Sequence, residues 1–372
     1  MKIATTRIHK TALASLAIAA TVFSLTACSN NADQSNSSGN TSTAKIGLLL
    51  PDSVTARYEA ADRPYFEAKI SSLCPKCTVL YSNADGDASK QQQQAESMLS
   101  QGVQVLVLDP FDGAAAASIV TAAKAKNVPV IAYDRMIDSP DLSYYISFDN
   151  ERVGELQAQA LVDNLKKTTI PEGSGILMVN GSPTDNNATL FKKGAHSVID
   201  KSGIKVLAEF DTPGWDPAQA ETWVSGQIAQ FGKKIVGIYA ANDGTASGAV
   251  AALKAANFSP WPPITGQDAE LAGIQRILAG QQYMTVYKAI RPQADKAATL
   301  AIDLVNGKKP SAPTMVANKS GHKIPSFLLT PVAVTVDNIN STVVKDKFYG
   351  SDSVAQICTS EFARYCTKHG IK

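Results

Sequence analysis

Asp134 and Arg135 form an acid–base pair that directly follows a run of apolar residues, 128–133. A continuous apolar run with β-branched residues predicts a buried parallel strand. In open α/β sheets, ligands bind beyond the carboxyl ends of such strands. A carboxylate beside a forked guanidinium could hold neighbouring hydroxyl groups there. The alternative is a structural ion pair at the strand end.

Polar side chains also follow other predicted strands, in both halves of the chain. Carboxylates, amides and cationic groups suit a neutral polyhydroxylated ligand, because each sugar hydroxyl both donates and accepts hydrogen bonds. Tyr58 and Trp215 could stack on a pyranose ring, although core packing is the alternative for Trp215 and a solvated surface position the alternative for Lys288. The candidate ligand-binding residues are Arg57, Tyr58, Asp134, Arg135, Asp185, Asn187, Trp215, Asn242, Asp268 and Lys288.

Two successive α/β patterns must position these residues. The chain alternates strand and helix patterns, which predicts parallel sheets with right-handed crossovers and two similar lobes that face a cleft. The expected strands are 45–50, 78–81, 103–108, 128–133, 175–179, 204–210, 235–240, 263–265 and 285–288, and the expected helices are 63–73, 88–101, 114–126, 151–165, 187–202, 218–231, 245–256, 269–279 and 292–306.

Catalytic motifs are missing from the sequence. It contains no phosphate-binding P-loop, no nucleophile elbow and no H-E-x-x-H zinc motif. No two of the four histidines have metal-ligand spacing. Asp134 and Asp268 could be imagined as a glycosidase pair, but the interleaved Arg, Asn and Lys residues favour a hydrogen-bonding cage. We therefore expect a binding protein with no catalytic residue, no metal and no cofactor.

The N-terminus has the order of a bacterial lipoprotein leader. Residues 1–27 combine a basic start with an apolar run, and Leu-Thr-Ala-Cys28 resembles a lipobox, which makes Cys28 the expected lipidation site. Residues 28–43 are rich in Ser, Asn and Thr and predict a flexible tether. The chain is therefore expected to be exported and lipid-anchored, facing the periplasm or the cell exterior. The alternative is an ordinary secretion signal with an incidental cysteine.

Charge and cysteine content narrow the class further. Without residues 1–27 the chain has 32 basic and 33 acidic residues, so nothing favours nucleic acid as a partner. Four cysteines in an exported protein favour disulfides. Spacing suggests Cys74–Cys77 and Cys358–Cys366, although three pairings are possible and Cys74–Cys77 could instead be a redox or metal motif.

Seven stretches of the chain resemble the type I periplasmic sugar-binding proteins of ABC transporters, specifically the D-xylose-binding branch. They occur in the same order along the chain as in that family. The resemblance covers about residues 45–350 and implies two flavodoxin-like, doubly wound lobes joined by three hinge crossings, with a monosaccharide held between them. The matching stretches are 132–137 (AYDRMI), 145–151 (YISFDNE), 153–157 (VGELQ), 181–188 (GSPTDNNA), 241–246 (ANDGTA), 265–273 (TGQDAELAG) and 284–288 (MTVYK).

The resemblance also assigns roles and boundaries. The N-terminal lobe would hold 44–149 plus about 289–330, and the C-terminal lobe 150–288 plus about 331–350, followed by a tail of 351–372 with its own disulfide. A monomer would bind a xylose-like aldopyranose and deliver it to an ABC permease; a chemoreceptor or sensor-kinase module and a secreted sugar-active enzyme are the alternatives. Tyr58 stands where the xylose binders typically have Trp, which leaves the preferred sugar open.

Overall fold

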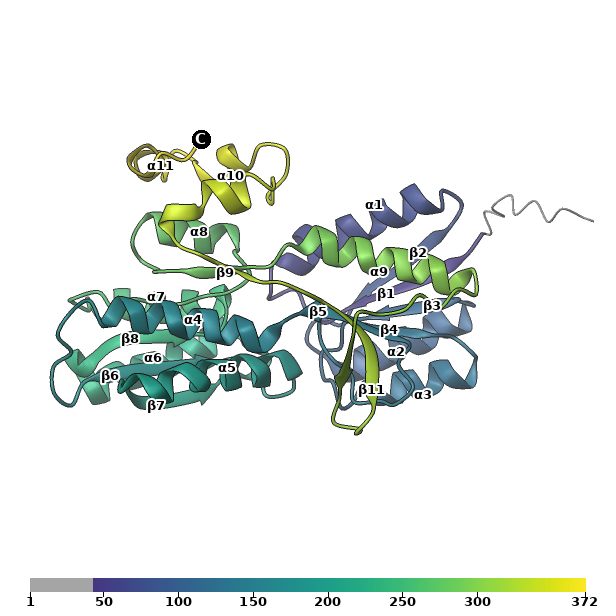
Figure 1. Cartoon of the computed structure of the whole chain (residues 1–372), viewed down its shortest axis with the longest axis horizontal. Coiled ribbons are helices and arrows are strands. Elements are labelled where there is room, and N and C mark those ends of the chain that lie inside the picture. The colour runs from purple at the N-terminus through teal and green to yellow at the C-terminus, as the bar shows by residue number, and fades with distance from the viewer. Residues whose placement is uncertain (1–42) are drawn as a thin grey trace, which may run out of the picture. The chain divides into compact units, whose positions relative to one another are not determined.

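The computed structural model describes residues 43–372 (Figure 1). The predicted leader of residues 1–27, the lipidation of Cys28 and the tether of residues 28–43 therefore lie outside the described residues, apart from residue 43. In the described part, no helix combines the length and the apolar character that crossing a membrane requires.

A seven-stranded sheet forms the first layer of the fold. Its strands lie in the order β10-β11-β5-β4-β3-β1-β2, and every neighbouring pair is parallel except β10 with β11. The order β2-β1-β3-β4-β5 is that of a flavodoxin-like sheet, so the predicted fold class is confirmed. The strands are β1 (Lys45–Leu50), β2 (Thr78–Asn83), β3 (Val105–Leu108), β4 (Val130–Tyr133), β5 (Tyr144–Phe148), β10 (Thr314–Ala317) and β11 (Lys323–Leu329).

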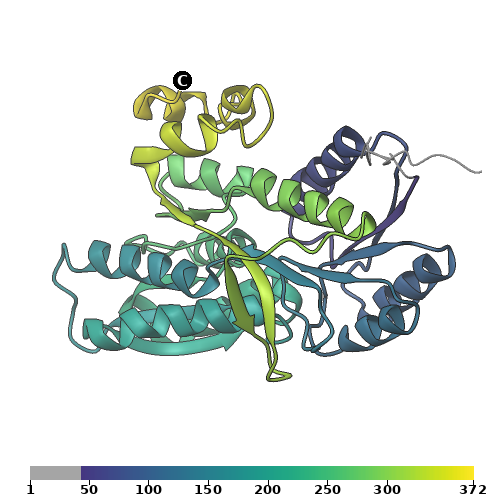
Figure 2. The same ribbon diagram turned by 45° about the vertical axis from the view of Figure 1, so that its right-hand side comes forward.

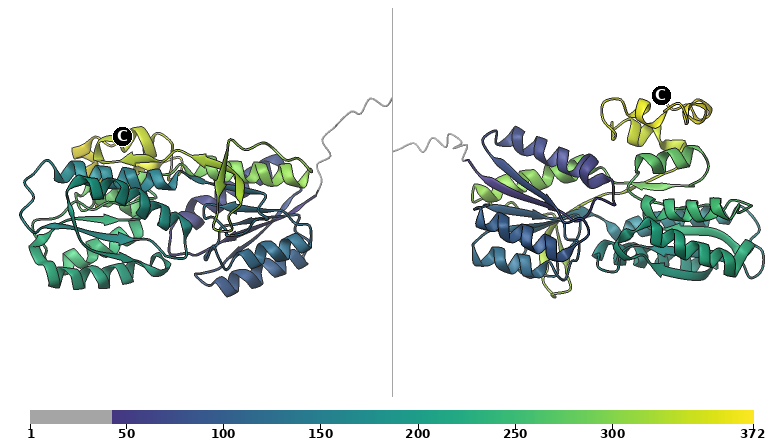
Figure 3. Two further views of the ribbon diagram at one scale, coloured as in Figure 1. Left: turned by 60° about the horizontal axis from the view of Figure 1, so that its bottom comes forward. Right: turned by 180° about the vertical axis from the view of Figure 1, so that it is seen from behind.

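Helices cover both faces of this sheet (Figure 3). Alternate strand residues point to opposite faces, so Leu49 packs towards α2 (Ala88–Ser100) and α3 (Ala117–Ala125). Leu48 packs on the other face, towards α1 (Arg63–Leu73) and α9 (Ile290–Val305). We call this sheet and its helices the first lobe.

The second lobe repeats the same strand order. β7 (Lys205–Asp211), β6 (Gly175–Asn180) and β8 (Ile235–Ala240) are parallel, and residues 263–268 lie between β8 and β9 (Thr285–Tyr287). β9 pairs with β12 (Val332–Val334). The helices of this lobe are α4 (Asn150–Leu165), α5 (Asn186–Ser202), α6 (Pro217–Phe231), α7 (Asp243–Ala255) and α8 (Leu271–Leu278).

The chain passes between the lobes three times, from β5 to α4, from β9 to α9 and from β11 to β12. Figure 2 shows the last of these segments returning from β11 towards the second lobe. Both lobes belong to one compact unit. These three connections are the candidates for the predicted hinge.

The C-terminal tail packs onto α8. Its short helices α10 (Ser353–Ile357) and α11 (Ala363–His369) bury Ile357 and Cys366 against Ile277. Disulfides join Cys358 to Cys366 and Cys74 to Cys77, the two pairings that spacing favoured.

Two local predictions are wrong, and strands β5, β10, β11 and β12 were not predicted. The helix expected at 114–126 begins only at Ala117, because the Asp112 side chain accepts hydrogen bonds from the backbone N–H groups of residues 114 and 115 and holds a turn. Residues 263–265 form a single bridge at Ile264, since a proline at 263 cannot donate to a ladder. Strand β5 mixes Tyr and Ser with apolar residues, so a search for continuous apolar runs does not detect it.

Candidate functional site

All ten predicted binding residues line one cavity between the lobes. The cavity has about 260 Å³ of space, including space open to solvent, and Thr55, Phe191 and Gln267 complete its wall. The prediction named the residues from separate strand ends, and the fold brings every one of them to the same place.

Arg57 is the centre of the first-lobe half of the wall. Its Nε and Nη2 lie 2.8 and 2.7 Å from the two carboxylate oxygens of Asp62, and Nη1 lies 3.2 Å from Oδ1 of Asp134. Gln293 of α9 accepts from Arg57 at 3.0 Å and donates to Asp134 at 3.2 Å. The Tyr58 ring lies between Arg57 and Arg135, whose guanidinium carbons are 5.5 and 5.6 Å from its centroid.

Asp134, Trp215 and Asp268 all have left-handed backbone, with φ of 57°, 58° and 93°. Such conformations cost on the order of 1–3 kcal/mol each and gather at functional sites. The turn after β4 thus directs the Asp134 carboxylate into the cavity. No apolar pattern in the sequence signals this geometry.

Asp185 and Trp215 form a unit in the second lobe. Asp185 caps the start of α5 by accepting from the backbone N–H of Asn187 at 2.8 Å, and it also accepts from Trp215 Nε1 at 3.1 Å. Trp215 is 4% exposed and lines the cavity. Gly181 packs under the ring, where a Cβ would lie 2.0 Å from Cη2 of the indole. The indole is therefore held rigidly against the cavity.

Asn242 and Lys288 occupy the remaining wall of the second lobe. Asn242 caps α7, with its Oδ1 accepting from the Thr245 N–H at 2.7 Å. Lys288 directly follows β9, and its Nζ lies 3.1 Å from Oδ1 of Asp268 and 3.9 Å from Oδ1 of Asp134. The side chain is buried, so the solvated-lysine alternative is wrong.

Several contacts join the two halves of the wall. Nε of Arg135 lies 3.0 Å from Oδ2 of Asp185, and Nδ2 of Asn187 donates to the backbone carbonyl of Asp134 at 3.1 Å. Nη1 of Arg57 lies 3.6 Å from Oδ1 of Asp268. Asp134 and Arg135 therefore do form buried ion pairs, but with partners from other elements.

The sequence prediction missed part of this charge cluster. Asp52 and Asp109 approach Arg135 at 3.3 and 3.8 Å, Asp62 binds Arg57, and Gln293 links Arg57 to Asp134. Only Asp109 carried a signal, because it directly follows a predicted strand. Asp52, Asp62 and Gln293 lie in segments whose local pattern is that of a loop or an ordinary helix.

Six buried aspartates surround three buried cations. Burial disfavours ionisation of Asp134, but Arg57, Lys288 and Arg135 outweigh it and hold its pKa well below the ordinary range. Burial, reinforced by the charge of Asp134, raises the pKa of Asp109 well above its ordinary value. The residues of the cluster are Asp52, Asp62, Asp109, Asp134, Asp185, Asp268, Arg57, Arg135 and Lys288. The excess of acidic side chains would repel an anionic ligand, but it would not repel a neutral one.

Several buried polar atoms, in the cluster and in the neighbouring Gln267, make no hydrogen bond with any described residue. They are both carboxylate oxygens of Asp109, Nε of Arg135, Oε1 of Gln267 and Oδ1 of Asp268. Buried polar groups are normally satisfied, and each exception calls for an explanation. Gln267, Asp268 and Arg135 line the cavity itself. Nε of Arg135 and Oδ1 of Asp268 are ion-paired with Asp185 and Lys288, at 3.0 and 3.1 Å, but make no well-aligned hydrogen bond. Hydroxyl groups, which donate and accept, match this mixture of acceptors and a donor.

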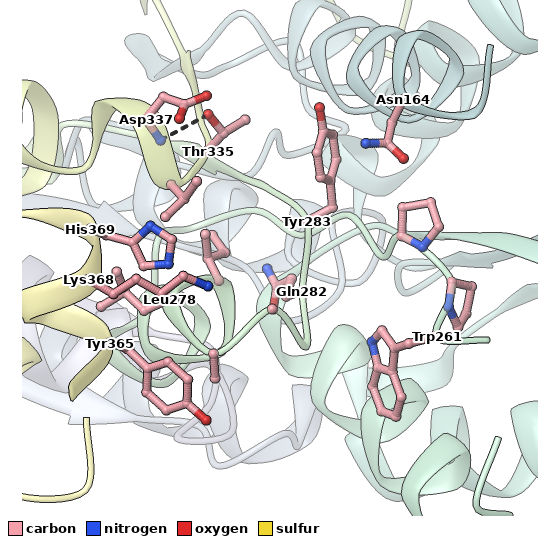
Figure 4. Close-up of a pocket in the computed structure, with 16 residues that line it drawn as sticks. Asn164, Trp261, Leu278, Gln282, Tyr283, Thr335, Asp337, Tyr365, Lys368 and His369 are labelled. Atoms are coloured by element: carbon pink, nitrogen blue, oxygen red, sulfur yellow. Dashed lines mark hydrogen bonds between the residues drawn. The ribbon is translucent and has the colours of Figure 1, made fainter. Parts of the chain in front are cut away.

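A separate hollow of about 970 Å³, including space open to solvent, lies beside the C-terminal end of α8, where Ile277 and Leu278 line it. Figure 4 shows Trp261 and Asn164 on one side of it, with Tyr365, Lys368 and His369 on the other. The indole N–H of Trp261 already donates to the carbonyl of residue 281 at 3.0 Å. None of the ten predicted residues lines this hollow.

Residues 46–309 match the periplasmic binding protein domain. The chain belongs to the periplasmic binding protein family. It is 44% identical to the D-xylose-binding periplasmic protein of Escherichia coli, over 82% of this chain and 91% of that protein. It is 40% identical to the D-xylose-binding periplasmic protein of Haemophilus influenzae, over 93% and 98% of the two chains.

Solved structures agree with this assignment. An ABC transporter solute-binding protein of Clostridium phytofermentans, solved with bound β-D-glucose, superposes with a TM-score of 0.75 at 29% identity, over 83% of this chain and 99% of that one. Periplasmic binding proteins are exported solute receptors, so this chain is a sugar-binding receptor of the ABC transporter type and not an enzyme. Among residues 43–372, no group of three or more His, Cys, Asp or Glu side chains could hold a metal ion.

Proposed function

We propose that this periplasmic binding protein captures D-xylose, or a closely similar aldopyranose, in the cavity between its lobes and delivers it to an ABC sugar permease. We further propose that Cys28 anchors the mature protein to the membrane. The relatives that carry D-xylose in their names align with 82% and 93% of this chain.

The single observation that carries the proposal is the set of polar atoms on the cavity wall that make no well-aligned hydrogen bond with a described residue. Oδ1 of Asp268 and Oε1 of Gln267 are acceptors, and Nε of Arg135 is a donor. A sugar with several hydroxyls can satisfy donors and acceptors together, and hydrogen bonds to charged groups are the stronger ones. The Trp215 indole and the Tyr58 ring supply apolar surface for the C–H groups of the pyranose.

Closure follows from the division of the wall between the lobes. Arg57, Asp134 and Arg135 come from the first lobe, and Asp185, Trp215 and Asn242 from the second. A sugar contacts both sets only when the lobes meet, so it binds the closed form more tightly than the open form. That difference in affinity shifts the population towards closure. The closed form then presents a two-lobe surface to a permease.

A thermal-shift screen tests the proposal. D-Xylose, L-arabinose, D-ribose, D-glucose and D-galactose are added separately to the mature protein, and the melting temperature is measured. We expect the largest rise with D-xylose, because a ligand that binds only the folded state stabilises it by mass action. A melting temperature that none of these aldoses raises would overturn the proposal.

A further inference from the structure

A second interlobe cavity adjoins the sugar cavity. It encloses about 960 Å³, including space open to solvent, and Arg57 and Asp268 line both cavities. Ala60 and Tyr65 of the first lobe form one side of it, and Leu271 of the second lobe forms part of the other. We call it the outer pocket.

The outer pocket is mainly apolar. Phe348 and Tyr349 close it from the C-terminal segment, and Phe348 and Tyr65 both pack against the cluster of Ala61, Phe148 and Ile290. The hydroxyl of Tyr349 donates to the carbonyl of Ala269, and that of Tyr65 donates to the carbonyl of Phe348 at 3.4 Å. Backbone carbonyls thus occupy the polar ends of both tyrosines, so their rings are what the pocket offers to a ligand.

The two residues that line both cavities make one weak contact with each other. Nη1 of Arg57 lies 3.6 Å from Oδ1 of Asp268, which is longer than a hydrogen bond. The same Oδ1 atom is ion-paired with Nζ of Lys288 at 3.1 Å, and Asp268 is 96% buried. Because Arg57 and Asp268 belong to different lobes, their contact opens when the lobes part. A ligand could therefore be enclosed across this boundary.

We propose that the protein also binds pentopyranosides that carry an alkyl or aryl substituent, with the sugar ring in the inner cavity and the substituent in the outer pocket. The inference rests on the proposed function of the inner cavity. An apolar substituent matches Ala60, Leu271 and the three aromatic rings. A second sugar ring fits less well, because its hydroxyls would lose water against a mainly apolar wall, whose charged side chains are Arg57, Asp268 and Glu270.

Calorimetric titration with 4-nitrophenyl xyloside, both anomers, tests the inference beside D-xylose and xylobiose. We expect one anomer of the glycoside to bind within about tenfold of D-xylose, and xylobiose to bind more weakly than that anomer. Ala60→Trp fills the outer pocket from an exposed position outside the inner cavity. Ala60→Trp should lower the affinity for the glycoside at least about tenfold and leave the affinity for D-xylose unchanged. Ala60→Ser should change neither affinity.

The outcomes separate the two claims. D-Xylose binding without binding of either glycoside anomer would overturn the inference and leave the proposed function standing. If Ala60→Trp lowers the affinities for the glycoside and for D-xylose equally, the substituent does not bind in the outer pocket. Tighter binding of xylobiose than of the glycoside would overturn the chemical class of the substituent. A protein that binds no D-xylose would contradict the proposed function itself.

Discussion

Nε of Arg135 lies 3.0 Å from Oδ2 of Asp185, and the two residues belong to different lobes. Arg135 follows β4, at the carboxyl edge of the first sheet. Asp185 caps α5 and accepts from the Trp215 indole at 3.1 Å. One carboxylate therefore links the guanidinium of the first lobe to the aromatic wall of the second. In the proposed mechanism, this contact couples lobe closure to the placement of the Trp215 ring.

Arg135→Ala should weaken D-xylose binding by roughly ten- to a hundredfold. The substitution removes a charged donor and leaves the buried carboxylate of Asp185 without its cationic partner, a loss of about 1.5–3 kcal/mol. Calorimetry measures the change. Arg152→Ala is the matched control, because Arg152 forms an exposed ion pair with Glu155 on α4. Equal affinities for the Arg135 variant and this control would contradict the assignment.

Asp134→Ala should lower the affinity for D-xylose by at least several-fold. Arg57 and Gln293 both donate to Asp134 Oδ1, at 3.2 Å each, and Lys288 lies near it. Truncation leaves these buried donors unpaired, at a cost of about 1–3 kcal/mol or more. Titration of the purified variant with pentoses and hexoses gives the affinity. Unchanged affinity would remove Asp134 from the site.

Gly181→Ala should displace the Trp215 ring. A Cβ at 181 would lie between 2.0 and 2.4 Å from three ring carbons, a distance that the ring cannot tolerate without moving. We expect at least about a tenfold loss of sugar affinity, in line with the contribution of an aromatic wall, and an altered tryptophan fluorescence. Gly226→Ala in α6 meets open space and should stabilise the helix by up to about 1 kcal/mol. Sugar affinity that survives in Gly181→Ala would show that the ring is not needed.

The described site also shows what a sequence can and cannot predict. Asp134 and Arg135 were identifiable because polar residues at the end of an apolar strand must lie at the sheet edge. Asp62 was not, because it lies in a helical segment and meets Arg57 only through a local turn. The left-handed backbone of Asp134 and Asp268 is set by tertiary contacts, so no periodicity reveals it. The fold class followed more readily, since alternating strands and helices leave few topologies open.

Stability should fall as the pH rises through the titration of Glu270. Burial, with the neighbouring charges of Asp243 and Asp268, raises its pKa from 4.5 to about 8, and Arg276 opposes the shift only in part. The folded state then holds a proton that the unfolded state releases, so the stabilisation is complete below the unfolded pKa and is lost as the pH rises through about 8.

Melting temperatures at pH values from about 5 to 9 test this titration. The wild type should lose more stability across the range than Glu270→Gln, which cannot ionise. Glu172→Gln, at an exposed position, is the control and should follow the wild type. Parallel curves for wild type and Glu270→Gln would show that Glu270 does not titrate there.

Removal of the tail disulfide should destabilise the protein more than removal of the first-lobe disulfide. Cys358–Cys366 spans a sequence separation of 8, whereas Cys74–Cys77 spans 3, and a longer closed loop restricts the unfolded chain more. We expect the Cys358→Ala/Cys366→Ala variant to lose about 2–4 kcal/mol of unfolding free energy. Chemical denaturation of both double variants measures the difference. A larger loss for the Cys74→Ala/Cys77→Ala variant would contradict the loop-length argument.

Calorimetric titration of D-xylose into the mature protein tests the central claim most directly. The cavity between the lobes predicts one sugar bound per chain, with affinity that falls in the Asp134 and Arg135 variants. The absence of binding by D-xylose, or binding that both variants leave unchanged, would contradict the assignment of this cavity as the sugar site.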